Sequence, residues 1–377
     1  MAGRDPSRIP QVGAMACPSF SGALDHSEQL GVMSGVPQRP VRVFLDARFA
    51  VRGLGIASAT CRLTEAIRAS EQVALRSNFS SGGWNRRGQL ETLRMSGFLE
   101  LTPAADPRTW GRDVVHYYGN TAPQLMGRRT LVTVHDLMSL RGTTAKSRLY
   151  QALLMPGLRR GRRGRVVAVS SQTADELLQV LPELRPRLQV ITHGRREGLF
   201  SAQPREHILL FGGQSDPRKR VSLALSAYST YAATQGASAL PLVIAGRAGI
   251  TPSLVAAHVT SGRVRIDENP GEDALSAVMA RAACLLYPSS EEGFGLPIVE
   301  AGEMGTPVVF DSSARLPSEP IGGHGFPVDG TNRQDWARAI AAAAMQGPVP
   351  NALDHLPTWD QVAGAYVEVY RLLAAAP

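Results

Sequence analysis

The chain has 377 residues, a hydrophobic content of 44% and a formal net charge of +8. This length can hold two domains with full hydrophobic cores, and the composition excludes a low-complexity protein. No apolar run approaches the ~20 residues of a membrane-spanning helix, and residues 1–40 lack the apolar core of a signal peptide. We therefore expect a cytoplasmic globular protein, with residues 1–40 as a disordered extension or a misassigned start.

The cysteines carry no sign of metal chemistry. Cys17, Cys61 and Cys284 show neither a C-x-x-C pattern nor another metal-ligand spacing. Cys61 and Cys284 lie on apolar periodic segments, which predicts buried free thiols in a reducing compartment.

The positive charge is concentrated in one part of the chain. Residues 1–40 hold three basic and three acidic residues, residues 41–200 hold 25 against 12, and residues 201–377 hold 12 against 17. The densest run is Arg159–Arg165, with five arginines. An anionic membrane surface or acceptor facing the first domain would explain this division, and a plain solvated face is the equal alternative. Nucleic-acid binding is not predicted, because no aromatic stacking pattern or known module accompanies the arginines.

Short apolar runs bounded by glycine, proline or polar residues recur along the chain, as is typical of buried parallel strands. In the first half they are Val41–Leu45, Val73–Arg76, Val114–Tyr118, Thr130–Val134, Val166–Val169 and Leu188–Ile191. In the second half they are Ile208–Phe211, Leu242–Ala245, Arg263–Ile266, Ala283–Tyr287, Pro307–Phe310 and Gly325–Val328. This rhythm predicts two α/β domains joined by a linker that ends near Pro204. An amphipathic helix is expected from Trp359 to Leu373.

A glycine loop separates the first strand from a helix with apolar residues at a 3.6-residue period. Its Gly53-x-Gly55 pattern suggests dinucleotide binding, but Ser58 occupies the third glycine position of that fingerprint. No acidic residue follows the second strand at the expected place either. A redox cofactor is therefore not predicted. Further along, Thr173-x-x-Glu176 is typical of a capping box and predicts a helix N-terminus at Thr173.

A histidine and a basic cluster follow two of the predicted strands. His135 comes directly after Thr130–Val134 and is either a satisfied structural residue or a residue that faces a ligand. Gly212-Gly213 follows Ile208–Phe211 and leads to Arg218-Lys219-Arg220, just before a helix expected from about Val221. Cations at a helix N-terminus oppose the helix dipole unless an anion lies there. The basic cluster therefore predicts an anion site.

The segment Pro288–Pro307 is the most informative part of the sequence. A glycine loop, Gly293-Phe294-Gly295, connects an apolar strand to a helix opened by Pro297, and proline suits a first helical turn. The free N–H groups of such a loop and helix N-terminus attract anions. Glu292 and Glu300 flank the loop, eight positions apart. Each carboxylate alone is more often structural than functional, but the pair and the loop together favour a ligand site.

Glu292-Gly-Phe-Gly-Leu-Pro with Glu300 resembles the E-x7-E signature of the retaining family 4 glycosyltransferases. The resemblance covers roughly residues 41–375 and is strongest in the second half. It implies the α/β GT-B fold, in which two Rossmann-like domains face each other across a cleft and a C-terminal helix packs back toward the N-terminal domain. The expected boundaries are 1–40 for the extension, 41–203 for the acceptor domain, 204–355 for the nucleotide-sugar donor domain and 356–377 for the crossover helix.

The resemblance also assigns catalytic roles. Glu292 would contact the donor sugar, and His135 would face that sugar from the other domain. Lys219, with Arg218 or Arg220 as a second cation, would neutralise the pyrophosphate leaving group, whose charge fixed cations stabilise in the transition state.

The remaining donor contacts follow from the same resemblance. Glu300 would hold the ribose hydroxyls of a nucleotide-diphosphate sugar, which is a substrate, so no cofactor is expected. Loop backbone near the donor would come from Gly53, Gly55, Gly212, Gly213, Gly246, Gly293, Phe294 and Gly295. The chain contains no D-x-D motif. We therefore expect a metal-independent enzyme in which Lys219 and its neighbours take the place of the metal.

The predicted function is a retaining hexosyltransferase acting on a glycan or lipid-linked acceptor in polysaccharide biosynthesis, with mannose from a guanosine carrier as the family-level preference. Some positions depart from the family pattern, including Gly213 for an arginine, Gly302 for a common methionine, and Leu316-Pro-Ser-Glu for Leu-Pro-Glu-Val. These departures keep an alternative open, a non-catalytic nucleotide-sugar-binding subunit of the same fold.

Overall fold

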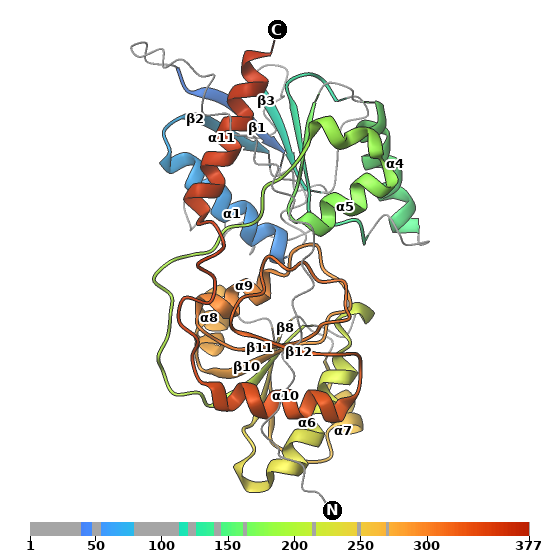
Figure 1. Cartoon of the computed structure of the whole chain (residues 1–377), viewed down its shortest axis with the longest axis vertical. Helices are drawn as coiled ribbons and strands as arrows, with labels where there is room; N and C mark the ends of the chain where they lie inside the picture. Colours follow the sequence, from blue (N-terminus) through green and yellow to red (C-terminus); the bar gives the residue numbers. More distant parts are fainter. Residues whose placement is uncertain are drawn as a thin grey trace, which may run out of the picture. The chain divides into compact units, whose positions relative to one another are not determined.

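The structure is a computed structural model. It describes residues 39–46, 54–78, 113–119, 126–138, 145–160, 164–212, 216–246, 250–268 and 271–376. From Pro40 onward the chain is one compact unit. Its described residues form two parallel sheets of six strands each, covered by helices (Figure 1).

The first sheet has the strand order β2-β1-β3-β4-β5-β6, and all its pairs are parallel. Its strands are β1 (Val41–Asp46), β2 (Val73–Asn78), β3 (Val114–Tyr118), β4 (Thr130–Val134), β5 (Arg165–Ala168) and β6 (Leu188–Val190). The order reverses between β1 and β3, as in doubly wound sheets that bind ligands at the carboxyl ends of the strands.

The second sheet has the order β12-β11-β10-β7-β8-β9 and is also parallel throughout. Its strands are β7 (His207–Phe211), β8 (Leu242–Gly246), β9 (Val264–Glu268), β10 (Ala282–Tyr287), β11 (Val308–Asp311) and β12 (Gly325–Val328). The chain winds outward in both directions from β7 and β10, which makes this pair the topological switch point of a Rossmann sheet. All of the strands expected from the sequence are confirmed, and their ends differ from the expected ones by at most two residues.

Helices cover both faces of each sheet. They are α1 (Leu54–Ala69), α4 (Ala145–Arg160), α5 (Ser171–Val180), α6 (Val221–Gln235), α7 (Pro252–His258), α8 (Glu272–Ala280), α9 (Leu296–Glu303), α10 (Arg333–Gln346) and α11 (Trp359–Ala375). Successive strand residues point to opposite faces. Ile208 and Leu210 therefore pack in a core with α6 and α10, whereas Leu209 packs in a core with α8 and α9 (Figure 1).

The terminal helix α11 packs on the first sheet, as expected. Tyr366 and Tyr370 are buried in one core with residues of α1 and β1. The returning chain crosses the linker at Gly194, where an added Cβ would lie 2.7 Å from the backbone nitrogen of Trp359. Arg195 continues this crossing by donating its backbone N–H to the carbonyl of Pro357 at 2.9 Å.

The predicted capping box at Thr173 is wrong. Helix α5 begins at Ser171, and the N-cap is Ser170, whose hydroxyl accepts the N–H of Thr173 at 3.1 Å. Serine and threonine are both good N-cap residues. Because β5 ends at Ala168 and the helix already begins at Ser171, the N-cap is Ser170 and not Thr173. The expectation for Cys61 is also corrected: its side chain is half-buried rather than buried, whereas Cys284 is a buried free thiol, as expected.

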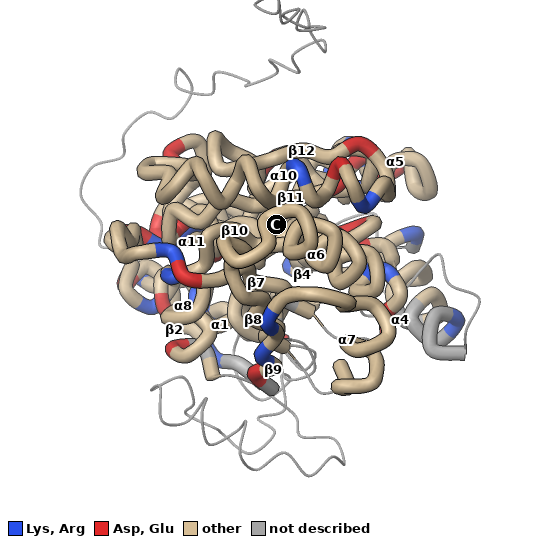
Figure 2. The backbone as a smooth tube through the Cα atoms, turned by 90° about the horizontal axis from the view of Figure 1, so that it is seen from below, with Lys and Arg blue, Asp and Glu red and all other residues tan. Residues whose placement is uncertain are grey.

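The arginine run spans two elements. Arg159 and Arg160 end α4, Arg165 begins β5, and residues 161–163 lie outside the described residues. Seen from below, basic and acidic segments are interspersed along the described part of the tube (Figure 2). Among the described helices, none combines the length and apolar character needed to cross a membrane.

Candidate functional site

The residues predicted to bind the donor lie at the switch point of the second sheet. Gly212 follows β7, and the segment from Ser289 to Gly295 follows the neighbouring β10. A Cβ at Gly246, which ends β8, would lie 2.3 Å from the carbonyl oxygen of Gly212. The two glycine backbones therefore touch, and a side chain at position 246 is excluded.

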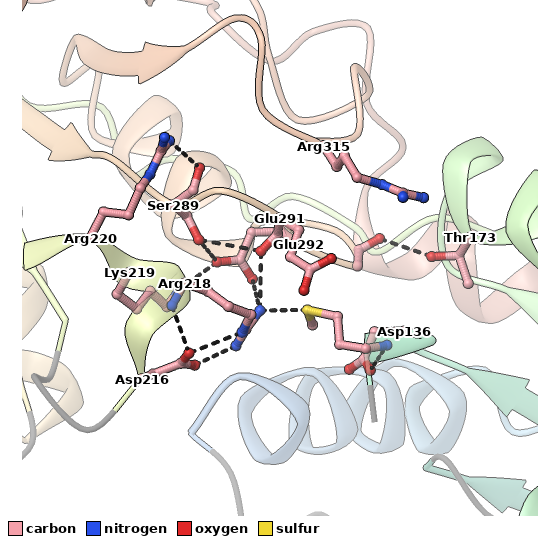
Figure 3. Close-up of polar contacts among 12 residues, drawn as sticks. Asp136, Thr173, Asp216, Arg218, Lys219, Arg220, Ser289, Glu291, Glu292 and Arg315 are labelled. Carbon is pink, nitrogen blue, oxygen red and sulfur yellow. Dashed lines mark hydrogen bonds and ion pairs between the residues drawn. The ribbon is translucent and has the colours of Figure 1, made fainter. Parts of the chain in front are cut away.

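Lys219 and Glu292 form an ion pair at the centre of this region (Figure 3). The Lys219 Nζ atom lies 2.5 Å from Glu292 Oε1, and the side chains are 20% and 12% exposed. Ser289 donates its hydroxyl to the same carboxylate oxygen at 2.6 Å. The ammonium also lies 5.1 Å from the centre of the buried Tyr287 ring, a favourable cation–π distance. Two predicted catalytic residues, 73 positions apart in sequence, are thus brought into contact.

Arg218 stands beside this pair and is held by its own loop. Its guanidinium contacts Asp216 Oδ2 at 2.5 Å and donates to the carbonyl of Glu291 at 3.1 Å, while Glu292 Oε2 lies 4.0 Å away. Burial opposes ionisation of Asp216, but the hydrogen bonds and charge of Arg218 outweigh it and lower the pKa of that carboxyl. Asp216 also caps the short helix Pro217–Lys219, which carries Arg218 and Lys219.

Arg220 points away from the Lys219–Glu292 pair into the domain. Its guanidinium forms an ion pair with the buried Asp311 at 2.7 Å and donates to the carbonyls of Pro288 and Ser289 at 2.5 and 3.2 Å. These contacts tie the end of β10 to the basic cluster. Of the two candidates for the second cation, Arg218 therefore has the better position.

Glu300 lies on α9, whose N-cap Gly295 adopts the left-handed region at φ 94°. Its carboxylate is 20% exposed and lies 3.4 Å from the guanidinium of Arg62, a largely buried residue of α1. Sequence reasoning missed Arg62, because a helical arginine looks like any surface cation until the fold brings α1 to α9. The pair extends the site to a residue of the first sheet's helices.

His135 is buried directly against residues 292–295, the loop between β10 and α9 that carries Glu292 and is called the signature loop. An added Cβ at Gly293 would lie 1.9 Å from the carbonyl oxygen of His135, so only glycine allows this approach. The imidazole of His135 stacks on that of His193, with ring centroids 5.3 Å apart, and His193 packs edge-on against Phe294 at 5.0 Å. Burial lowers the pKa of His135 to about 3, so the ring is neutral at physiological pH.

The N-terminus of α5 also contacts the signature loop. Ser170 and Thr173, both buried, donate hydroxyl hydrogens to the carbonyl of Gly293 at 2.7 and 3.2 Å. Gln172 donates its amide to the carbonyl of Glu292 at 3.2 Å. Sequence reasoning placed these residues on a helix start but gave them no role. The available signal was their position after a strand that neighbours the strand of His135.

Of three further glycines predicted to lie near the donor, the structure describes one. Gly53 and Gly213 lie outside the described residues. Gly55 is exposed on α1, and a Cβ there would lie 3.6 Å from Leu296 at the start of α9. Within the described ranges, the His, Cys, Asp and Glu side chains form no group of three or more that could hold a metal ion.

Comparisons with known proteins relate the second sheet to sugar transfer. Residues 205–345 match the family described as "Glycosyl transferases group 1". The chain is 26% identical over 237 residues to a D-inositol 3-phosphate glycosyltransferase of Rhodococcus opacus, covering 55% of this chain and 53% of that protein. It is 31% identical over 180 residues to the O-antigen chain mannosyltransferase B of Escherichia coli, covering 44% and 45%. The chain thus spans about half the length of the curated relatives it matches.

Solved structures extend the likeness to nearly the whole chain. A sucrose-phosphate synthase from Thermosynechococcus elongatus superposes with a TM-score of 0.62 at 17% identity, covering 89% of this chain and all of that one. WaaG, a glycosyltransferase involved in lipopolysaccharide biosynthesis, superposes with a TM-score of 0.57 at 14% identity, covering 88% and 97%. The protein therefore has the GT-B fold, and its residues 205–345 are similar to the glycosyl transferases group 1 family.

Proposed function

We propose that the protein is a retaining glycosyltransferase that moves a hexose from a nucleotide-diphosphate sugar to a glycan or lipid-linked acceptor. One observation carries the proposal: Lys219 and Glu292 meet at 2.5 Å at the switch point of the second sheet. This is where a Rossmann sheet binds nucleotides. The E-x7-E resemblance to family 4 supports the retaining outcome and the assignment of Glu292 to the donor sugar.

The chemistry of the leaving group explains the basic cluster. Cleavage of the bond between sugar and diphosphate leaves additional negative charge on the departing phosphate. Lys219 and Arg218, together with the loop N–H groups, would stabilise that charge without a metal ion. The neutral imidazole of His135 would act toward the sugar as a hydrogen-bonding group rather than as a cation. Glu300 would accept two ribose hydroxyls.

Names of relatives guide the choice of donor and acceptor. A mannosyltransferase and an inositol-phosphate glycosyltransferase are among them, which supports mannose from a guanosine carrier as the first donor to test. Thermal-shift measurements with GDP, UDP, ADP and their hexose conjugates should reveal one stabilising base and sugar. Radiolabelled transfer from that donor, with and without chelator, then tests turnover. A rate that requires added metal would contradict the proposed role of the cations.

The same two measurements separate catalysis from the alternative function. A nucleotide-sugar-binding subunit would be stabilised by the donor yet would transfer no sugar to water or to any acceptor preparation. Absence of stabilisation by every nucleotide sugar would refute both functions.

The arginine run motivates a membrane-facing acceptor side. Basic residues near an anionic leaflet contribute about 1 kcal/mol each, and the attraction is screened over a Debye length of ~8–10 Å. Sedimentation with anionic and neutral vesicles at two salt concentrations is the test, using the unmutated protein and a variant with Arg159, Arg160, Arg162 and Arg163 changed to Gln. Salt-insensitive binding to both vesicle types, or binding to neither, would favour a soluble acceptor.

A further inference from the structure

Side chains at the N-terminus of α5 form hydrogen bonds with the backbone of the signature loop. The carbonyl of Gly293 accepts the Ser170 hydroxyl at 2.7 Å and the Thr173 hydroxyl at 3.2 Å. The preceding carbonyl, that of Glu292, accepts the amide of Gln172 at 3.2 Å. Two consecutive carbonyls of the donor-side loop are therefore held by three side chains of one helical turn from the other sheet.

Burial makes these contacts specific. Ser170 is 0% exposed and Thr173 is 1% exposed, so water cannot replace their hydroxyls at Gly293. A buried carbonyl that loses its donors keeps the full desolvation penalty. Gly293 also lies against the His135 backbone, because a Cβ there would come within 1.9 Å of the His135 carbonyl oxygen.

Weaker contacts surround these hydrogen bonds. The exposed N–H of Ser171 donates to Glu319 at 2.6 Å, and Arg315, which is 54% exposed, pairs with Glu176 at 2.6 Å. Gln172 also reaches the carbonyl of Arg315 at 3.3 Å. Thr173 and Arg315 lie on the side of Glu292 opposite the basic cluster (Figure 3). Solvent screening limits what the exposed ion pair contributes, so the buried hydroxyls and Gln172 define the contact.

We propose that Ser170, Gln172 and Thr173 are positioning residues for Glu292. They hold the peptide groups on the carboxyl side of Glu292, and so they set the direction of its carboxylate relative to Lys219. The inference rests on the proposed function, in which Glu292 meets the donor sugar. Nucleotide binding depends on Lys219 and Glu300, whose ion pairs are with Glu292 and Arg62 and not with the three residues at the α5 N-terminus. Loosening the hydrogen bonds from α5 therefore lowers turnover and leaves nucleotide affinity unchanged, because catalytic groups displaced by as little as ~1 Å lose much of their effect.

Thr173→Val and Gln172→Ala are the informative variants, because neither removes the Ser170 cap of α5. Thr173→Ser keeps the hydroxyl and serves as the rescue, and Ser171→Ala changes an exposed side chain on the same turn. We expect Thr173→Val and Gln172→Ala to lower kcat about tenfold or more, with the affinity for the nucleoside diphosphate unchanged within about twofold. Thr173→Ser and Ser171→Ala should retain kcat within about twofold.

Amide hydrogen exchange over residues 292–296 gives a second readout that needs no turnover. Thr173→Val and Gln172→Ala should speed exchange in this loop at least several-fold, while exchange in α10 stays constant as a check on folding. An unchanged kcat, a loss that appears only in nucleotide affinity, or unchanged loop exchange would overturn the proposal. Should the unmutated protein transfer no sugar at all, the proposed function fails, and loop exchange still decides whether α5 holds the loop.

Discussion

The contact between Lys219 and Glu292 makes a prediction with opposite signs for binding and catalysis. In the structure the ammonium that would meet the diphosphate is paired with the carboxylate that would meet the sugar, at 2.5 Å. Donor binding must therefore share Lys219 between Glu292 and the phosphate. Lys219→Met removes the cation. Glu292→Gln removes the carboxylate that competes with the phosphate for Lys219, and with it a negative charge near the phosphates.

The geometry sets the size of each effect. Hydrogen bonds to charged groups contribute about 1.5–3 kcal/mol, and the partial exposure of both side chains places this pair at the lower end. We expect Lys219→Met to weaken binding of a nucleoside diphosphate by about 1.5–2 kcal/mol and to weaken the monophosphate much less. Glu292→Gln should bind the diphosphate at least as tightly as the unmutated protein, while turnover falls by two orders of magnitude or more, about 2.7 kcal/mol.

Isothermal titration with GDP, UDP and ADP and with the matching monophosphates measures the nucleotide affinities. Urea unfolding of the two single variants and of the double variant forms a double-mutant cycle, which measures the coupling free energy between Lys219 and Glu292. The coupling between the two substitutions should be about 1–2 kcal/mol, because Ser289 still donates to Glu292 when Lys219 is gone. An equal loss of diphosphate and monophosphate affinity in Lys219→Met would make the lysine structural. A tenfold loss of diphosphate affinity in Glu292→Gln would refute the competition argument.

Three other predictions address the ribose contact, the loop and pH. Glu300→Ala should weaken every bound nucleotide by about 1.5–3 kcal/mol whichever sugar is attached, and unchanged affinities in calorimetry would exclude the ribose contact. Gly293→Ala should lower the free energy of unfolding by about 1–3 kcal/mol or more, because its Cβ would meet the His135 carbonyl at 1.9 Å, whereas Gly323→Ala, with no atom within 4 Å, should stay near the unmutated value in urea titrations. Burial lowers the pKa of His116 and of His135 from 6.5 to about 3, so their neutral-state stabilisation is complete above pH 6.5 and is lost as pH falls toward 3. Each should remove about 1.4 kcal/mol of unfolding free energy between pH 7.5 and 5.5, and a stability that is flat over that interval would contradict the burial of neutral rings.

The sequence by itself determined the elements and the donor-side motif. Apolar runs and glycine punctuation placed every described strand, because buried parallel strands need continuous apolar sequence. The spacing of Glu292 and Glu300 around Gly293–Gly295 placed the loop between a strand and a helix N-terminus, because these three elements are consecutive in the chain. The strand order of the second sheet then placed that loop at the switch point. Strand positions and the strand–loop–helix segment depend on residues close together in sequence, so sequence patterns are enough to predict them.

Contacts between distant segments were decided by tertiary structure alone. Sequence spacing does not reveal that Lys219 and Glu292 pair, that Arg62 meets Glu300 from 238 positions away, or that Arg220 turns toward Asp311. The sequence predicted Thr173 as the N-cap of α5, whereas the structure has Ser170 in that position. Ser170 follows β5 and donates its hydroxyl to the carbonyl of Gly293, 123 positions further along the chain. The strand order of the second sheet brings Lys219 to Glu292 and Arg220 to Asp311. Packing between the two sheets brings Arg62 to Glu300 and Ser170 to Gly293. Such long-range contacts have no periodic signature in the sequence.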